Sequence, residues 1–145
     1  MIDKNIFNKE INSIGSKGVV IIGGKMLIYR RDTNTEYFPL YIDLPGGGKE
    51  LDESPFETFQ REVKEEFGIS INEGDIVYAK KYIGVMDPTK DSYFFATKNL
   101  DSVSHPVIPG NEGSEFSSIE IKEYLELTDA INRQQDRVRE YLNSL

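Results

Sequence analysis

The segment SPFETFQREVKEEFG, residues 54–68, constrains the fold more than any other part of the chain. Ser54 is placed to cap the N-terminus of a helix, and the glutamate three positions later completes a capping box. Pro55 suits the first helical position, and Gly68 is typical of the residue that follows a helix. These signals predict a helix from about residue 55 to residue 67.

On such a helix four apolar residues share one face, which predicts contact with a core: Phe56, Phe59, Val63 and Phe67. Glu62 and Glu66 lie one turn apart on the same side of this face, and Glu66 falls at its edge. Like charges at this spacing repel each other, at a cost of about 0.2–0.5 kcal/mol per pair. The acidic face is therefore either simply solvated, or it has a function that offsets the repulsion.

Strand patterns precede this helix. The segment GVVIIGGKMLIYRR, residues 18–31, predicts two strands joined by a two-residue turn at Gly23 and Gly24. A short apolar strand is expected at residues 40–44, and Pro45 then opens a loop of three glycines.

Strand patterns also follow the helix. Residues 75–86 and 92–100 predict two strands, and residues 116–121 predict another. Residues 128–145 predict an amphipathic C-terminal helix with four residues facing inward: Ile131, Val138, Leu142 and Leu145. Strands on both sides of a central helix indicate an α/β fold with a mixed sheet in layers.

Composition limits the class of protein. A length of 145 residues favours one domain over residues 1–145. The net charge of −8 argues against a nucleic acid polymer as a partner, because phosphate contacts need clustered basic residues. The chain has no cysteine, so disulfides and thiolate metal sites are excluded. The first residues lack the apolar segment of a signal peptide, and no stretch is apolar enough to cross a membrane. We expect a soluble, cytoplasmic protein.

The residues of the predicted helix and of the glycine loop before it follow one spacing pattern. The pattern G-x5-E-x7-R-E-U-x-E-E-x-G-U, in which U is a bulky aliphatic residue, is matched at every position by Gly47, Glu53, Arg61, Glu62, Val63, Glu65, Glu66, Gly68 and Ile69. Seven fixed residues at a background of roughly 7% each give a chance match of about 10⁻⁸ per window. In this pattern the chain resembles the Nudix (MutT-like) hydrolases.

The resemblance implies a Nudix-type α/β/α sandwich with a mixed sheet and a loop–helix motif that binds a divalent cation. In the family, the glutamates that match Glu62, Glu65 and Glu66 bind the metal, and the carbonyl of the glycine that matches Gly46 joins them. Mg²⁺ prefers oxygen ligands of this kind and shares itself with substrate phosphates, and Mn²⁺ is an alternative.

Other residues of the motif have supporting roles by the same resemblance. Gly47 and Gly48 lack a Cβ atom, so their backbone can approach a bound diphosphate. Arg61 and Glu53 are expected to form an ion pair that ties the loop to the helix.

Three glutamates are candidates for the general base that activates the attacking water. Nudix enzymes often carry an acidic residue in a later loop, and Glu112 in the segment PGNEGSE matches it best, as metal ligand or general base. Glu115 is the alternative in that loop, and Glu65 is the competing base within the motif.

Four residues before the glycine loop are candidates for substrate contact. Arg30 and Arg31 end a predicted strand where relatives hold a substrate-binding arginine, but a solvated strand end fits them equally well. Tyr37 and Phe38 are placed to stack on a nucleobase, although packing at the rim is the commoner use of such aromatics.

The activity that the resemblance implies is metal-dependent hydrolysis of a phosphoanhydride in a nucleoside diphosphate linked to another moiety. Nucleoside triphosphates, ADP-ribose and nucleotide sugars all stay open as substrates: Pro88 stands slightly late for the ADP-ribose subgroup, and Met86 replaces the tyrosine of the dinucleotide polyphosphate subgroup.

Two other functions are weighed. Isopentenyl diphosphate isomerase shares the fold, but its chemistry usually needs a cysteine, which this chain lacks. A Nudix-like sensor would bind nucleotides without hydrolysing them, but such domains typically lose motif glutamates. Residues 1–16 and the C-terminal helix are left unexplained by the motif, and either could serve a homodimer.

Overall fold

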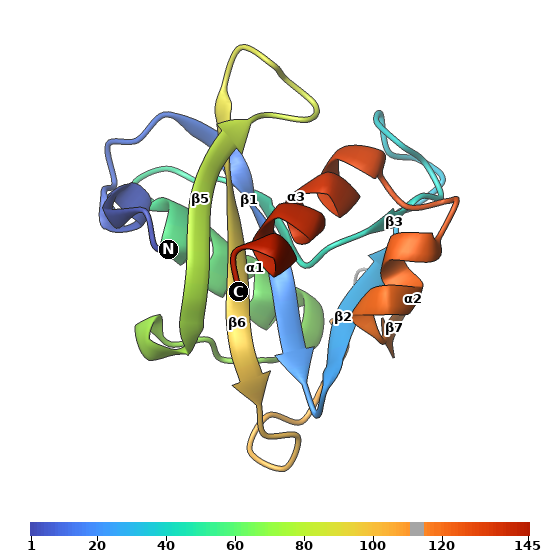
Figure 1. Ribbon diagram of the computed structural model, residues 1–145. Coiled ribbons are helices and arrows are strands. Elements are labelled where there is room, and N and C mark those ends of the chain that lie inside the picture. The colour runs from blue at the N-terminus through green and yellow to red at the C-terminus, as the bar shows by residue number, and fades with distance from the viewer. Residues whose placement is uncertain (111–114) are drawn as a thin grey trace.

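In the computed structural model, which describes residues 1–110 and 115–145, a twisted mixed sheet lies between helices (Figure 1). The strands are β1 (Ser13–Ile22), β2 (Lys25–Arg30), β3 (Ile42–Asp43), β4 (Gly46–Gly48), β5 (Ile76–Ile83), β6 (Asp91–Leu100) and β7 (Phe116–Ile119). The α-helices are α1 (Pro55–Phe67), α2 (Ile121–Glu126) and α3 (Asn132–Asn143), and two short 3₁₀ helices are η1 (Lys4–Phe7) and η2 (Glu73–Asp75).

The main path of the sheet runs β3-β2-β1-β6-β5, with β4 paired to β1 and β7 paired to β2. The β1–β2 hairpin is antiparallel and turns at Gly23 and Gly24, whose φ angles of 57° and 83° suit a primed turn. Strand β1 runs parallel to β6 on its other side, so the sheet is mixed as the sequence predicts.

Side chains alternate between the two faces along the central strands, so each face of the sheet carries its own apolar core. Helices cover both cores. Val20 of β1 and Phe95 of β6 pack on the α1 side, in a core that contains the whole apolar face of α1. Val19 and Phe94 point to the other face, where α2 and α3 cover them. In Figure 1, α1 lies behind the sheet and α3 in front. The α/β/α sandwich is confirmed.

The prediction of helix 55–67 is confirmed at both ends. Ser54 accepts a hydrogen bond from the Glu57 N–H, Glu57 closes the capping box, and Gly68 adopts the left-handed conformation with φ 71°. The four apolar residues of its inner face are buried.

Other element boundaries differ from the sequence prediction. The strand expected at residues 40–44 is only Ile42–Asp43, since Leu40 has a positive φ of 64° and is exposed. The C-terminal helix begins at Asn132, and Leu145 was wrongly expected to face inward: it is 83% exposed because it lies beyond the end of α3. Helix α2 was not predicted at all.

The N-terminal segment covers an edge of the sheet. Ile2 bridges to Ala79 of β5, the last strand on the path, and the Asp3 N–H donates to the Ala79 carbonyl. Ile6 of η1 is buried beside α1. These contacts protect backbone groups that an exposed edge strand would leave unpaired. Within the part of the chain that the structure describes, no helix is long and apolar enough to span a bilayer.

Candidate active site

Strand β1 brings the glycine segment and the glutamate helix together. Gly46 of β4 pairs with Lys17 of β1, and the Ser16 hydroxyl donates to the Pro55 carbonyl at the start of α1, at 2.8 Å. Gly46 has a φ of 125°, and a Cβ atom there would lie 2.0 Å from the Ser16 carbonyl oxygen. Only glycine fits this conformation and this close approach.

Two carboxylates of α1 touch the glycine strand directly. The Gly46 N–H donates to Glu66 Oε1 over 2.9 Å. A Cβ atom on Gly47 would lie 2.6 Å from Glu62 Cδ, so the Glu62 carboxylate occupies the space that a side chain at Gly47 would fill. The missing Cβ atom is therefore what lets Glu62 lie against the backbone.

Arg61 ties the helix to the loop, as predicted. Its Nε lies 2.6 Å from Glu53 Oε2, and its Nη2 donates to the Gly48 carbonyl at 2.8 Å. Its Nη1 lies 2.9 Å from Glu62 Oε1 and 3.2 Å from Glu65 Oε2. Burial opposes ionisation of Glu53, but the hydrogen bonds from Arg61 and from a backbone N–H outweigh it and hold its pKa below the usual range.

Burial changes the ionisation of the two carboxylates that touch the glycines. It raises the pKa of Glu66 to about 8, although the Lys17 charge and the Gly46 N–H favour the ionised form. Burial also raises the pKa of Glu62 against the opposing effect of Arg61. Both groups are more basic than ordinary carboxylates, as expected where a cation would replace the proton.

A partly buried cation that was not predicted from the sequence, Lys17, lies beside the glycine strand. The Lys17 ammonium donates to the Tyr29 hydroxyl at 2.7 Å and to the Gly46 carbonyl at 2.9 Å, and lies 3.1 Å from Asp43 Oδ2. Asp43 is fully buried and also pairs with Arg31 at 2.9 Å. Burial disfavours the charged ammonium, but Asp43 outweighs it, with help from Tyr29, and raises the pKa of Lys17. A lysine inside an apolar strand, and an aspartate between Ile42 and Leu44, were the signals for this pair.

Several of these residues line a cleft of about 430 Å³, a volume typical of small-molecule sites. One wall carries Glu62, Glu66 and the three glycines of β4, with Lys17 and Arg31 beside them. The other wall was not predicted from the sequence and carries Val85, Met86, Ser92, Gln134 and Arg137.

The donor set of the first wall fits a hard divalent cation. Glu62, Glu66 and the Gly46 carbonyl offer oxygen atoms at one place, and a carbonyl oxygen that already accepts from Lys17 keeps a second lone pair. Glu65 is turned toward Arg61 and does not line the cleft. Among the described residues, no three acidic or histidine side chains are gathered closely enough to hold a metal ion, and Arg61 occupies Glu62 and Glu65 with ion pairs.

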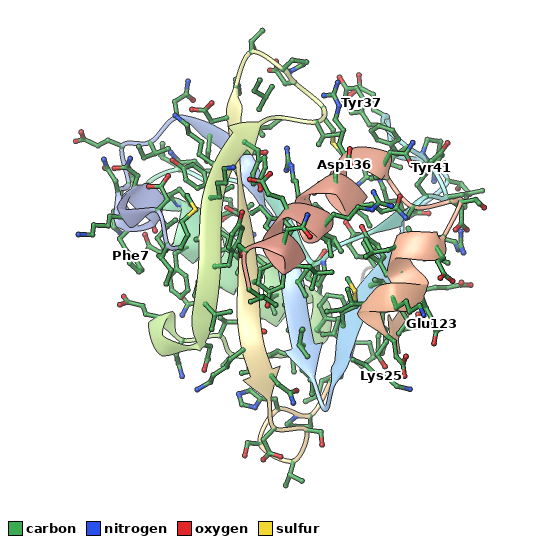
Figure 2. All side chains as sticks on the ribbon, in the orientation of Figure 1. Phe7, Lys25, Tyr37, Tyr41, Glu123 and Asp136 are labelled. Atoms are coloured by element: carbon green, nitrogen blue, oxygen red, sulfur yellow. The ribbon has the colours of Figure 1, made fainter. Side chains whose placement is uncertain are left out.

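Several predicted substrate contacts lie away from this cleft. Arg30 pairs with Asp129 at 3.0 Å, whereas its neighbour Arg31 lines the cleft. Tyr37 is 43% exposed, and Figure 2 shows it with Tyr41 on the loop between β2 and β3. Phe38 packs edge-on against Tyr41, with 5.5 Å between ring centroids.

The acidic loop before β7 is only partly described. Glu112, the preferred later-loop carboxylate, lies outside the described residues. Glu115, the alternative, is exposed and accepts a hydrogen bond from the Arg30 N–H through its backbone carbonyl, at 2.7 Å. Its side chain does not line the cleft.

A comparison with models of known protein families identifies the family of this chain. The model of the NUDIX domain matches residues 15–143, which include the sheet, α1 and the cleft. The chain belongs to the Nudix family. The expected membership of the Nudix hydrolases, and with it the expectation of a Nudix pyrophosphohydrolase, is confirmed.

Solved structures agree with the Nudix fold. The MutT protein of Methanosarcina mazei Go1 has a TM-score of 0.72 and 25% identity over 93% of this chain and 96% of that chain. An Ap4A hydrolase of C. elegans has a TM-score of 0.62 and 16% identity, over 90% and 99%.

A third similar structure is a bifunctional NMN adenylyltransferase/ADP ribose pyrophosphatase of Francisella tularensis, complexed with AMP and a Mn ion. Its TM-score is 0.60 and its identity 17%, over 81% of this chain and 35% of that chain. At these identities the second and third likenesses concern the fold alone. No curated protein sequence matches the chain.

Proposed function

We propose that this Nudix protein hydrolyses a phosphoanhydride bond in a nucleoside diphosphate linked to another moiety, with Mg²⁺ or Mn²⁺ as cofactor. The substrates in view are nucleoside triphosphates and compounds of the ADP-ribose or nucleotide-sugar type. Two observations support the proposal: the membership of the Nudix family, and the oxygen ligands that one wall of the cleft offers to a divalent cation.

The contact between Glu66 and Gly46 carries the proposal. It places a partly buried carboxylate with a raised pKa against a backbone conformation that only glycine can adopt, with Glu62 one turn away against Gly47. A divalent cation held by Glu62, Glu66 and the Gly46 carbonyl would neutralise the diphosphate and lower the pKa of the attacking water.

Other residues of the chain hold the loop and the metal-binding carboxylates in place and offer a charge to the substrate. Arg61 fixes Glu62 through its hydrogen bond at 2.9 Å and fixes the loop through Glu53 and the Gly48 carbonyl. Arg31, anchored on Asp43, presents a positive charge to the cleft for a phosphate group.

A carboxylate must take the proton of the attacking water, and two candidates are kept. Glu65 is the first candidate: it lies next to Glu66 on α1, has 47% of its side chain exposed, and would have to leave its contact with Arg61 at 3.2 Å to reach the attacking water. Glu112 is the alternative, from the later loop.

The test is hydrolysis of a panel of nucleoside triphosphates, ADP-ribose and nucleotide sugars with Mg²⁺ or Mn²⁺, and with EDTA. Glu66→Gln should lose at least about a hundredfold in metal-dependent kcat/KM while its unfolding stays cooperative. The matched control is Glu123→Gln, on the surface of α2 and outside the cleft, which should keep the wild-type rate. A Glu66→Gln enzyme with the wild-type rate would refute the assignment.

The competing function is a sensor that binds without hydrolysis. Calorimetric titration of the same panel with and without Mg²⁺ separates the two functions. Binding with no turnover of any compound would favour the sensor.

A further inference from the structure

The side chain of Lys17 reaches from β1 to the segment that joins β3 to β4. Its Nζ atom donates to the Gly46 carbonyl at 2.9 Å, to the Leu44 carbonyl at 3.2 Å and to the Tyr29 hydroxyl at 2.7 Å. Asp43 Oδ2 lies 3.1 Å from the same nitrogen atom. An ammonium group has three N–H donors, so these oxygen atoms use all of them.

Strand β1 holds three consecutive carbonyl groups of this segment. The carbonyls on either side of Pro45 accept from Lys17, and the Pro45 carbonyl accepts from the Gly18 N–H at 3.0 Å. Pro45 has no N–H of its own with which to anchor the segment. The direction of the carbonyl that follows, that of Gly46, therefore depends in part on the Lys17 side chain.

Gly46 offers both of its backbone polar groups to the candidate metal site. Its N–H donates to Glu66 Oε1 at 2.9 Å, and its carbonyl is one of the oxygen atoms placed for the cation. The Lys17 ammonium contacts that carbonyl and also attracts the Glu66 carboxylate by its charge. Lys17 thus acts on two of the proposed metal ligands, and it lines the same cleft.

Direct contact with a substrate phosphate is the other role open to a lysine in this cleft. The Lys17 side chain is 14% exposed, and each of its N–H groups is already directed at an oxygen atom of the protein. A phosphate would have to displace one of these oxygen atoms. The geometry therefore favours a lysine that holds the backbone over one that binds the substrate.

We propose that Lys17 is a positioning residue for metal binding, whose ammonium holds the Gly46 carbonyl in the direction from which this oxygen binds the divalent cation. The second lone pair of the carbonyl oxygen stays available to the cation. This role rests on the proposed function, because it takes Glu62, Glu66 and the Gly46 carbonyl as the metal-binding set. Charge alone would have the opposite effect, since a positive charge beside a cation site repels the cation.

The sign of the effect on metal affinity tests this role. Mn²⁺ is titrated without nucleotide into the wild-type chain and into Lys17→Met, and free Mn²⁺ is measured by electron paramagnetic resonance. Methionine is similar in length but has neither the charge nor the donors. Positioning predicts about tenfold to a hundredfold weaker binding by Lys17→Met, whereas the loss of a repelling charge predicts tighter binding. Equal or tighter binding would overturn the inference.

Lys49 provides a matched control. Its ammonium also donates to a backbone carbonyl, that of Ile11 at 2.8 Å, but it lies outside the cleft. Lys49→Met should bind Mn²⁺ with the wild-type affinity. An equal loss of affinity in both variants would show that the effect does not depend on the contact with Gly46, and would overturn the inference.

Chemical rescue separates positioning from a general loss of structure. Lys17→Ala removes the part of the side chain that corresponds to n-propylammonium, and the space that it leaves borders the cleft. At constant ionic strength, n-propylammonium should restore Mn²⁺ binding to Lys17→Ala but not to Lys17→Met, whose side chain fills the space. n-Propanol, which has no charge and a single donor, should restore neither. Failure of the amine to restore binding to Lys17→Ala would assign Lys17 to folding alone.

Urea unfolding first establishes that each variant folds. If Lys17→Met does not, the double variant with Asp43→Asn takes its place, because it removes the buried charge that has lost a partner, and it should show the same weaker Mn²⁺ binding.

The outcomes also separate this inference from the proposed function. Weaker nucleotide binding by Lys17→Met with unchanged Mn²⁺ binding would assign the ammonium to phosphate, which overturns the inference and leaves the hydrolase intact. Weaker Mn²⁺ binding that the amine restores, in a chain that hydrolyses none of the diphosphates, would support the positioning role and refute the hydrolase.

Discussion

The backbone N–H of Gly46 donates a hydrogen bond to Glu66 Oε1 over 2.9 Å, and so joins the glycine strand to the edge of the buried face of α1. The contact places a carboxylate where burial makes it basic and where a carbonyl oxygen of the same glycine is available. The repulsion between the carboxylates of this helix face would be offset by a divalent cation bound between them.

The first prediction concerns pH and the stability of EDTA-treated protein. The pKa of Glu66 is about 8 when folded and about 4.5 when unfolded, so the folded state binds more protons between these values. Stability from this group is therefore complete below about pH 4.5 and is lost as the pH rises through 8. Urea unfolding should show wild type losing about 2–5 kcal/mol relative to Glu66→Gln over this range. Parallel pH curves for the two proteins would contradict the raised pKa.

The second prediction concerns Gly47. A methyl group there would lie 2.6 Å from Glu62 Cδ, so Gly47→Ala should displace this carboxylate without unfolding the chain. Titration with Mn²⁺ should show about tenfold to a hundredfold weaker metal binding. The control is Gly74→Ala, where no atom lies within 4 Å of the added group. Unchanged metal binding by Gly47→Ala would remove Glu62 from the metal site.

The third prediction concerns Arg61. Arg61→Gln should lower the free energy of unfolding by about 1–3 kcal/mol, because Glu53 and the Gly48 carbonyl lose a charged donor. Lysine at this position should not restore it, since one ammonium cannot reproduce the planar fork. Lys64→Gln, exposed on the same helix, serves as the control in urea unfolding. Full stability of Arg61→Lys would show that charge alone is needed.

The fourth prediction concerns the pair of Lys17 and Asp43. Lys17→Met leaves the buried Asp43 with Arg31 as its remaining ion pair, and should cost about 3 kcal/mol in urea unfolding. Adding Asp43→Asn should recover at least about half of this loss, because it removes the underpaired charge. If the double variant is no more stable than Lys17→Met, the two residues do not act as a pair.

Some of this structure could be read from the sequence because its determinants are local. The bounds of α1 depend on Ser54, Pro55 and Gly68, which act within one helical turn. The edge position of Glu66 follows from helical geometry, and the pairing of Arg61 with Glu53 follows from the motif register. Strand β4 was missed because three glycines carry no strand signal, and it exists only by pairing with β1.

The second wall of the cleft could not be predicted, for a similar reason. Gln134 and Arg137 are ordinary polar residues of an amphipathic helix in the sequence. Their burial depends on α3 crossing the sheet near Ser92 and Met86, which are about forty to fifty residues away along the chain. The partnership of Lys17 with Asp43 likewise depends on which strands become neighbours.

The central claim is that Glu62, Glu66 and the Gly46 carbonyl bind a divalent cation beside a diphosphate. A crystal structure with Mg²⁺ and a non-hydrolysable nucleoside triphosphate analogue tests it most directly. We predict an ion about 2.1 Å from oxygen atoms of this set and of the phosphates. Phosphates bound elsewhere, with Glu62 still on Arg61 and Glu66 still on the Gly46 N–H and no ion between them, would contradict it.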